Sequence, residues 1–307
     1  MTFSVTFGHV RASVATQIMS PVSEAGLTCL REMRRNLRSA KGVVMGVLFL
    51  LGGAAASLIY AAVSELTNPA RQGHDVPDEA FRELRQKVWA EVWNADIGGY
   101  LADSPSIFVA LFKGSLWFIP FMTLMIGFEQ VCGDLQHRTI RYTAIRARRE
   151  SIIAGKFLAV WGVVSVLLLA LHAFVWFVTL VRGDATFAQI LAWGPRMWAL
   201  SAIYTAAYAG LTILISSLTK RPVISLFLGL IAFSLLWVLD LAVDFARMVE
   251  SERFSWLQYL GYAIPDYYEA WLVTPKAPQM VGAMAILLAF GAGATALAGW
   301  IVDRRDV

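Results

Sequence analysis

Residues 157–181 read FLAVWGVVSVLLLALHAFVWFVTLV, and this apolar run, which contains no Asp, Glu, Lys or Arg, decides the fold class. An α-helix rises about 1.5 Å per residue, so a stretch of this length crosses the roughly 30 Å hydrocarbon layer of a bilayer. Similar stretches occupy residues 42–63, 107–128, 197–218, 223–243 and 280–302. The sequence therefore predicts an all-α, polytopic integral membrane protein with six transmembrane helices.

The overall composition agrees with this prediction. Hydrophobic residues make up 58% of the chain and charged residues 16%, with a mean hydropathy of +0.60. Soluble domains average about 45–50% apolar and about 25% charged residues. The net charge of +4 is too small to indicate a nucleic-acid partner. One transmembrane domain over residues 1–307, surrounded by lipid, is expected.

The distribution of charge predicts the orientation. Lys and Arg concentrate before the first apolar stretch, in residues 129–156, in the short turn 219–222 and after the last stretch, whereas Asp and Glu concentrate in the alternate segments. Cytoplasmic segments carry the excess of basic residues. We therefore expect a multi-pass protein of the inner (plasma) membrane with both termini cytoplasmic.

Residues 23–38 combine an apolar and a basic face at helical spacing. The apolar stripe consists of Leu27, Leu30, Met33 and Leu37. The adjoining basic face consists of Arg31, Arg34, Arg35 and Arg38. This pattern is typical of an amphipathic helix in the inner interface, with its arginines toward anionic lipid headgroups.

Two long segments are expected on the outer side. Residues 64–106 contain DEAFRELRQKVWAEVW, which is rich in helix formers and predicts a surface helix. Residues 244–279 carry six Tyr and Trp residues around Pro265, a composition that suits a re-entrant segment packed at the outer interface. The length of 64–106 is compatible with a periplasmic partner or with a substrate-specific cap.

Catalytic and metal-binding motifs are lacking from the sequence. Gly155-Lys156 is no phosphate-binding loop, because Glu150 stands where its first Gly belongs and Phe157 replaces its hydroxyl residue. No Cys/His cluster has metal-ligand spacing, and Cys29 and Cys132 are expected as free thiols. We expect no catalytic residue, no metal and no cofactor, so any ATP hydrolysis belongs to another chain.

Ionisable residues inside the apolar stretches call for a functional hypothesis. Lys113 and Asp240 have opposite charges and both lie toward the outer end of their stretches, so they are candidates for a pair that holds an outer gate. Snorkelling of each side chain to the interface is the alternative. His172 lies midway along its stretch and is expected to be a neutral histidine bonded across helices rather than a proton carrier.

Small residues at four-residue spacing predict close contacts between helices. They occur as Gly42 and Gly46, as Gly52 and Ala56, and as Ala285, Ala289 and Gly293. Packing within the chain accounts for most of them, and one such face is a candidate dimer contact.

Residues 129–156 read EQVCGDLQHRTIRYTAIRARRESIIAGK and connect two apolar stretches. A charged cytoplasmic helix held between two membrane helices can transmit movement from a soluble partner, whereas a solvated basic loop facing lipid would not. In this segment the chain resembles the permease subunits of type-2 ABC exporters. The resemblance rests on Glu129, Thr139-Ile140, Arg146 to Arg149 and Gly155-Lys156 in the family's order and spacing.

The resemblance implies that residues 138–150 include a coupling helix that docks on a separate ABC ATPase subunit. The implied coupling residues are Glu129, Thr139, Arg141, Arg146, Arg148, Arg149, Gly155 and Lys156. Two positions depart from the family pattern: Arg138 stands where the family usually has Gly, and the turn at 144–149 lacks Pro.

The leading interpretation is therefore the permease subunit of an ATP-driven exporter, acting with a second copy or a paralogue and with two ATPase subunits. A secondary transporter would show broken helices or charges near the membrane midplane, and of the candidates only His172 qualifies. An intramembrane scaffold of an envelope complex would be indifferent to changes in 138–150. The sequence leaves the substrate and the direction of transport open.

Overall fold

A computed structural model describes residues 20–67, 78–139, 147–249 and 255–305 of the chain. Within these residues six helices are long and apolar enough to cross a membrane, which confirms the predicted number. They belong to α2 (Ala40–Thr67), α5 (Ser106–Gly127), α8 (Arg149–Arg182), α9 (Phe187–Leu218), α10 (Pro222–Val249) and α13 (Ala277–Asp303).

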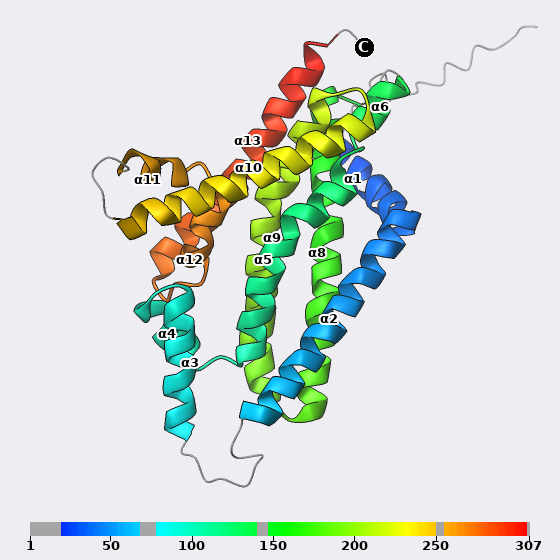
Figure 1. Cartoon of the computed structure of the whole chain (residues 1–307). Helices are drawn as coiled ribbons and strands as arrows, with labels where there is room; N and C mark the ends of the chain where they lie inside the picture. Colours follow the sequence, from blue (N-terminus) through cyan, green and yellow to red (C-terminus); the bar gives the residue numbers. More distant parts are fainter. Residues whose placement is uncertain (1–19, 68–77, 140–146, 250–254, 306–307) are drawn as a thin grey trace, which may run out of the picture.

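The long helices form one bundle with two distinct ends (Figure 1). We call the end that carries α6 (Cys132–Gln136) the α6 end, and the opposite end, which carries α3 (Asp78–Val92), the α3 end. Helix α1 (Pro21–Arg38) and the last turn of α13 both lie at the α6 end (Figure 1). Helix α10 runs obliquely across the other long helices, and the two described chain ends lie on the same side of the bundle (Figure 1).

Two of the six helices begin earlier than hydropathy indicates. Helix α8 begins at Arg149 rather than near Phe157, and α9 at Phe187 rather than near Met197. In α9 the apolar pattern is interrupted by Arg196, whose guanidinium lies 5.2 Å from the ring centre of Tyr100 and 5.8 Å from that of Trp193. Because aromatic faces cover the charge, the helix continues through it.

Helix α9 forms the centre of the bundle. About four fifths of its apolar window is buried, against less than a third for α2 and α10. It packs most extensively on α13, where Gly210 and Gly291 leave no room for a Cβ atom on either backbone. Helices α2 and α10 therefore present most of their apolar surface to the medium around the bundle, as expected for helices in contact with lipid.

Helix α1 contacts the bundle with both polar and apolar residues, and Met33 and Leu37 of the predicted stripe are partly buried against the core. It begins after Ser20, whose Oγ accepts a hydrogen bond from the Ser23 amide at 3.2 Å. Its buried residues are Ala25, Glu32 and Asn36. Two leucines of the predicted apolar stripe, Leu27 and Leu30, are more than half exposed. The predicted helix is confirmed, and its contact with lipid headgroups stays a prediction.

The remaining described helices lie at the α3 end and beside the far end of α10 (Figure 1). Helix α3 is the predicted surface helix, and it forms a hairpin with α4 (Ala95–Leu101), which begins where Asn94 Oδ1 accepts from the Ile97 amide at 2.9 Å. The aromatic segment consists of α11 (Ser255–Gly261), the 3-10 turn η2 (Pro265–Tyr268) and α12 (Glu269–Leu272). Its insertion into a membrane stays a prediction.

Candidate functional site

The ammonium group of Lys156 is the centre of a polar network at the α6 end. Lys156 lies in the second turn of α8, and its side chain is fully buried. Its Nζ donates to the backbone oxygen of Gln130 at 2.5 Å and pairs with Asp134 Oδ2 at 2.7 Å. A buried charge must be paired and hydrogen-bonded to be tolerated, so these contacts join α8 to α6.

The side chain of Gln130 extends the network to α1. It is fully buried, and its Nε2 donates to Asn36 Oδ1 at 2.8 Å. Its Oε1 accepts from Arg35 at 3.5 Å. Glu32 is only 1% exposed and pairs with Arg35 at 2.8 Å and with Arg31 at 3.1 Å. Two of the four predicted interfacial arginines thus hold a buried carboxylate of their own helix.

Helix α1 also makes close backbone contact with the start of α8. A Cβ atom on Gly155 would lie 2.6 Å from Thr28 Cβ and 2.7 Å from the backbone oxygen of Ala25. Glu24 Oε2 accepts a hydrogen bond at 3.1 Å from the backbone amide of Arg148, the residue that caps α8. Gly155 therefore permits the approach that places the arginine-bearing helix against the predicted coupling segment.

Serine hydroxyls tie the α5–α6 junction to two further membrane helices. Ser216 of α9 donates to the Phe128 carbonyl at 2.8 Å, and its Oγ accepts from the amides of Val131 and Cys132 at 3.1 Å each. Ser225 of α10 donates to the same Phe128 carbonyl at 2.8 Å. These bonds satisfy backbone groups that the change of helix direction leaves open.

Two other predicted residues, Glu129 and Thr139, are also bonded. Glu129 pairs with Lys41 at the start of α2, and the Lys41 ammonium lies 4.7 Å from the ring centre of Phe128. Thr139 Oγ1 donates to Asp134 Oδ1 at 3.0 Å, next to the contact with Lys156. The junction therefore contacts α1, α2, α8, α9 and α10.

The predicted arginines of the segment occupy different places. Arg148 is exposed, and Arg149 donates to the backbone oxygen of Asp303 at 3.4 Å. Arg141 and Arg146 lie outside the described residues. Arg34 and Arg38 are exposed on α1. The structure thus leaves basic groups of α1 and of the segment on the surface of the α6 end.

Arg138 adopts a backbone conformation that explains an anomaly of the sequence. Its φ angle of 54° lies in the left-handed region, which glycine adopts at little cost. This is the position where the type-2 exporter pattern usually has Gly. A glycine would adopt this conformation of residue 138 more readily than the arginine that this chain carries.

A comparison with protein families matches residues 29–306 to the family described as ABC-2 family transporter protein. The chain belongs to the ABC-2 transporter family. It is a multi-pass membrane permease of an ABC transporter, a transport component with no catalytic role implied by that family. A comparison with curated proteins found no match.

At the α3 end of this permease, Lys113 pairs with a residue that the sequence analysis missed. Its Nζ lies 2.6 and 2.7 Å from the two carboxylate oxygens of Glu269 in α12, rather than pairing with the expected Asp240. Trp93 Nε1 donates to Glu269 Oε1 at 2.7 Å. Glu269 thus forms the direct ion pair with Lys113, and Asp240 interacts with Lys113 only through longer-range electrostatics.

Asp266 lies beside this ion pair. Its Oδ1 accepts from the Tyr208 hydroxyl at 3.0 Å. Burial, together with the negative charge of Glu269, raises the pKa of Asp266 to about 7. Its carboxyl group is therefore partly protonated at neutral pH, which limits repulsion from Glu269. These contacts fasten the aromatic segment to α5 and α9.

His172 makes its hydrogen bond within one helix. The fully buried ring bonds through Nδ1 to the Leu168 carbonyl at 2.9 Å, one turn earlier in α8. The expected bond across helices is therefore replaced by a local one. Among the described residues no group of His, Cys, Asp and Glu could hold a metal ion, and Cys29 and Cys132 are free.

The sequence analysis missed Glu32, Asn36, Gln130, Asp134 and Glu269. Only Glu32 carried a local signal, since a carboxylate between arginines of an amphipathic helix is a candidate for pairing. The others are recognised only by partners far away in the chain.

Replacing Lys156 with Met should destabilise the protein by about 3–5 kcal/mol, because Asp134 then keeps a largely buried charge without its partner. Adding Asp134→Asn should restore part of the loss. Thermal unfolding of the purified protein measures both effects. Lys41→Met is the matched control, since its partly exposed pair with Glu129 is worth about 1 kcal/mol or less. Equal losses for Lys41→Met and Lys156→Met would contradict the central role of Lys156.

Replacing Arg138 with Gly should stabilise the protein by roughly 1 kcal/mol, because glycine adopts the left-handed conformation without the cost of a Cβ. Arg138→Ala removes the same charged side chain but keeps the Cβ, and it should give no comparable gain. Unfolding midpoints in detergent compare the two variants. An equal gain in both variants would show that the loss of charge, rather than the backbone conformation, is responsible.

Reversing either charge of the Lys113–Glu269 pair should destabilise the α3 end by roughly 3 kcal/mol. The double variant Lys113→Glu/Glu269→Lys should recover much of that loss, although Trp93 then loses its acceptor. Lys113→Glu/Asp240→Lys is the matched control and should recover little. Recovery of stability in the control alone would support the Lys113–Asp240 pair that the sequence predicts and would contradict the Lys113–Glu269 pair.

Proposed function

We propose that this permease belongs to an ATP-driven exporter and that a separate ABC ATPase subunit docks on residues 138–150. The observation that carries the proposal is the buried network around Lys156. It links the segment with the family's coupling pattern to α1 through Gln130 and to the start of α8 through Asp134. A soluble partner that pushes on such a junction moves several membrane helices together.

The direction of force transmission follows from the contacts. Closure of the ATPase subunits would press on the exposed basic surface that includes Arg148, Arg34 and Arg38. The junction passes this movement to α1 and α8 through Gln130 and Lys156, and to α9 and α10 through Ser216 and Ser225. Tilting of these helices would open the transport path.

In this proposal the protein lies in the inner (plasma) membrane. Its α6 end faces the cytoplasm, and both termini are cytoplasmic. The excess of Lys and Arg in the segments at that end supports the assignment. Arg31 and Arg35, which stay more than half exposed beside their contacts with Glu32, would contact anionic headgroups, which fits the exposure of Leu27 and Leu30. A second copy or a paralogue would complete the path, and the largely exposed helix α10 offers an apolar face for it.

A co-purification experiment tests the ATPase partner. The parent chain, isolated from its native host in mild detergent, should carry a P-loop ATPase identified by mass spectrometry. The variant Arg141→Glu/Arg146→Glu/Arg148→Glu should lose that partner, because the charge of the docking segment is reversed. The matched control Arg82→Glu/Lys87→Glu/Lys276→Glu makes the same charge change at the α3 end and should retain it.

Absence of any ATPase from the parent under all mild conditions would contradict the proposed partner. Loss of the ATPase from both variants would instead indicate a general effect of charge, and it would contradict the assignment of the docking site to residues 138–150.

A further inference from the structure

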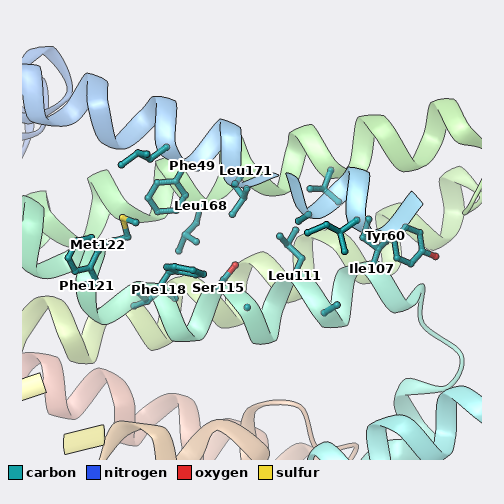
Figure 2. Close-up of a pocket in the computed structure, with 18 residues that line it drawn as sticks. Phe49, Tyr60, Ile107, Leu111, Ser115, Phe118, Phe121, Met122, Leu168 and Leu171 are labelled. Carbon is teal, nitrogen blue, oxygen red and sulfur yellow. The ribbon is translucent and has the colours of Figure 1, made fainter. Parts of the chain in front are cut away.

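A cavity of about 720 Å³ separates α2 from α5, with α8 as its floor (Figure 2). Its wall is almost entirely apolar and includes Phe49, Leu111, Met122, Leu168 and Leu171. Ligand sites in proteins commonly measure roughly 300–1,000 Å³ and combine apolar walls with a few polar groups. We call this space the α2–α5 cavity.

The small residues of α2 and α5 line this cavity instead of packing against each other. Gly52 and Ala56 lie on its α2 wall, and Ala110 and Gly114 lie on its α5 wall. A Cβ atom built on Gly52 or Gly114 would meet no atom within 4 Å. The close helix contact expected of Gly52 and Ala56 is therefore absent here, and the two faces enclose open space.

One buried polar atom on the cavity wall has no partner. Ser115 is 5% exposed, and its Oγ makes no hydrogen bond to any described residue. A serine inside a helix ordinarily bonds to a carbonyl one turn earlier or to solvent. Figure 2 shows the Ser115 oxygen among the lining side chains, with the Tyr60 ring farther along the cavity toward the α3 end.

The cavity opens sideways to the medium around the bundle. The lining residues Ile59 and Phe118 are 65% and 62% exposed, and Leu48 is about half exposed. All three belong to membrane-spanning segments, so this medium is lipid hydrocarbon. Water needs two to four polar partners to be held in a cavity, and this wall offers too few along most of its length.

We propose that the α2–α5 cavity binds one hydrocarbon chain of a membrane lipid, which enters from the bilayer between the two helices. The apolar wall provides the contact area, and the small residues provide the width. Ser115 places a polar atom where an ester group of the lipid can meet it. The proposal is independent of the ATPase partner and of the direction of transport.

Photo-crosslinking tests the site. The purified protein is placed in nanodiscs that contain phosphatidylethanolamine with a diazirine within its acyl chain, and labelled residues are mapped by mass spectrometry. Labels should concentrate on the cavity wall of α5 and α8. They should exceed those on Phe177 and Val181, which lie on α8 outside the cavity and are 64% and 70% exposed.

Filling the cavity should remove the label. In Gly52→Leu/Gly114→Leu the new side chains occupy open space, so folding is expected to persist. Wall labelling should fall to the level of Phe177 and Val181, because the new side chains fill the space that the acyl chain would occupy. The control Gly282→Leu adds the same side chain at another open position on α13 and should keep the label.

A free fatty acid with the diazirine at the same carbon distinguishes the sources of the chain. Equal labelling by both probes means that the cavity recognises only the acyl chain. Labelling by the phospholipid alone means that contacts to its headgroup also contribute to binding. Both results support the proposal.

Wall labelling of the parent no stronger than labelling of Phe177 and Val181 would overturn the proposal, whether or not the filled variant folds. Unchanged labelling in a folded Gly52→Leu/Gly114→Leu variant would do the same. If the parent self-associates and the filled variant keeps its label but loses that self-association, the cavity is instead a contact site for a second copy.

Discussion

The pairing of the Lys156 ammonium is the constraint on which the α6 end depends. A full charge without solvent exposure is tolerated only where oxygen atoms surround it, and Gln130 and Asp134 provide them. Meeting this requirement fixes α6 against α8. Because Gln130 also bonds to Asn36, the same requirement places α1. The position of three elements thus follows from one buried lysine.

The α3 end is organised around a second lysine in the same way. Lys113 lies within the apolar stretch of α5, and Glu269 and Trp93 join around it from distant parts of the chain. Between helices in lipid, apolar contact alone discriminates poorly among partners, because lipid chains are as apolar as leucine. Polar contacts of this kind select the correct neighbours at both ends of this permease.

The middle of the bundle follows a different rule. Where backbones approach closely, as at Gly210 and Gly291, small residues permit the contact and no polar group is required. The same residue types on α2 and α5 border open space instead. A small-residue pattern therefore indicates that two helices can approach closely. Whether they do so depends on how the neighbouring helices pack.

Six membrane-length helices, the amphipathic helix before them and the family could all be predicted from the sequence, because hydropathy, helical period and motif order are properties of single segments. The sequence also marked Arg138 as a departure from the family pattern, and the structure shows a left-handed backbone there. The pairing of Lys113 with Glu269 and the continuation of α9 through Arg196 could be recognised only in the folded chain. The cavity that Gly52 and Gly114 border could likewise be recognised only there. Each of these depends on groups brought together from distant positions, and no local pattern records such contacts.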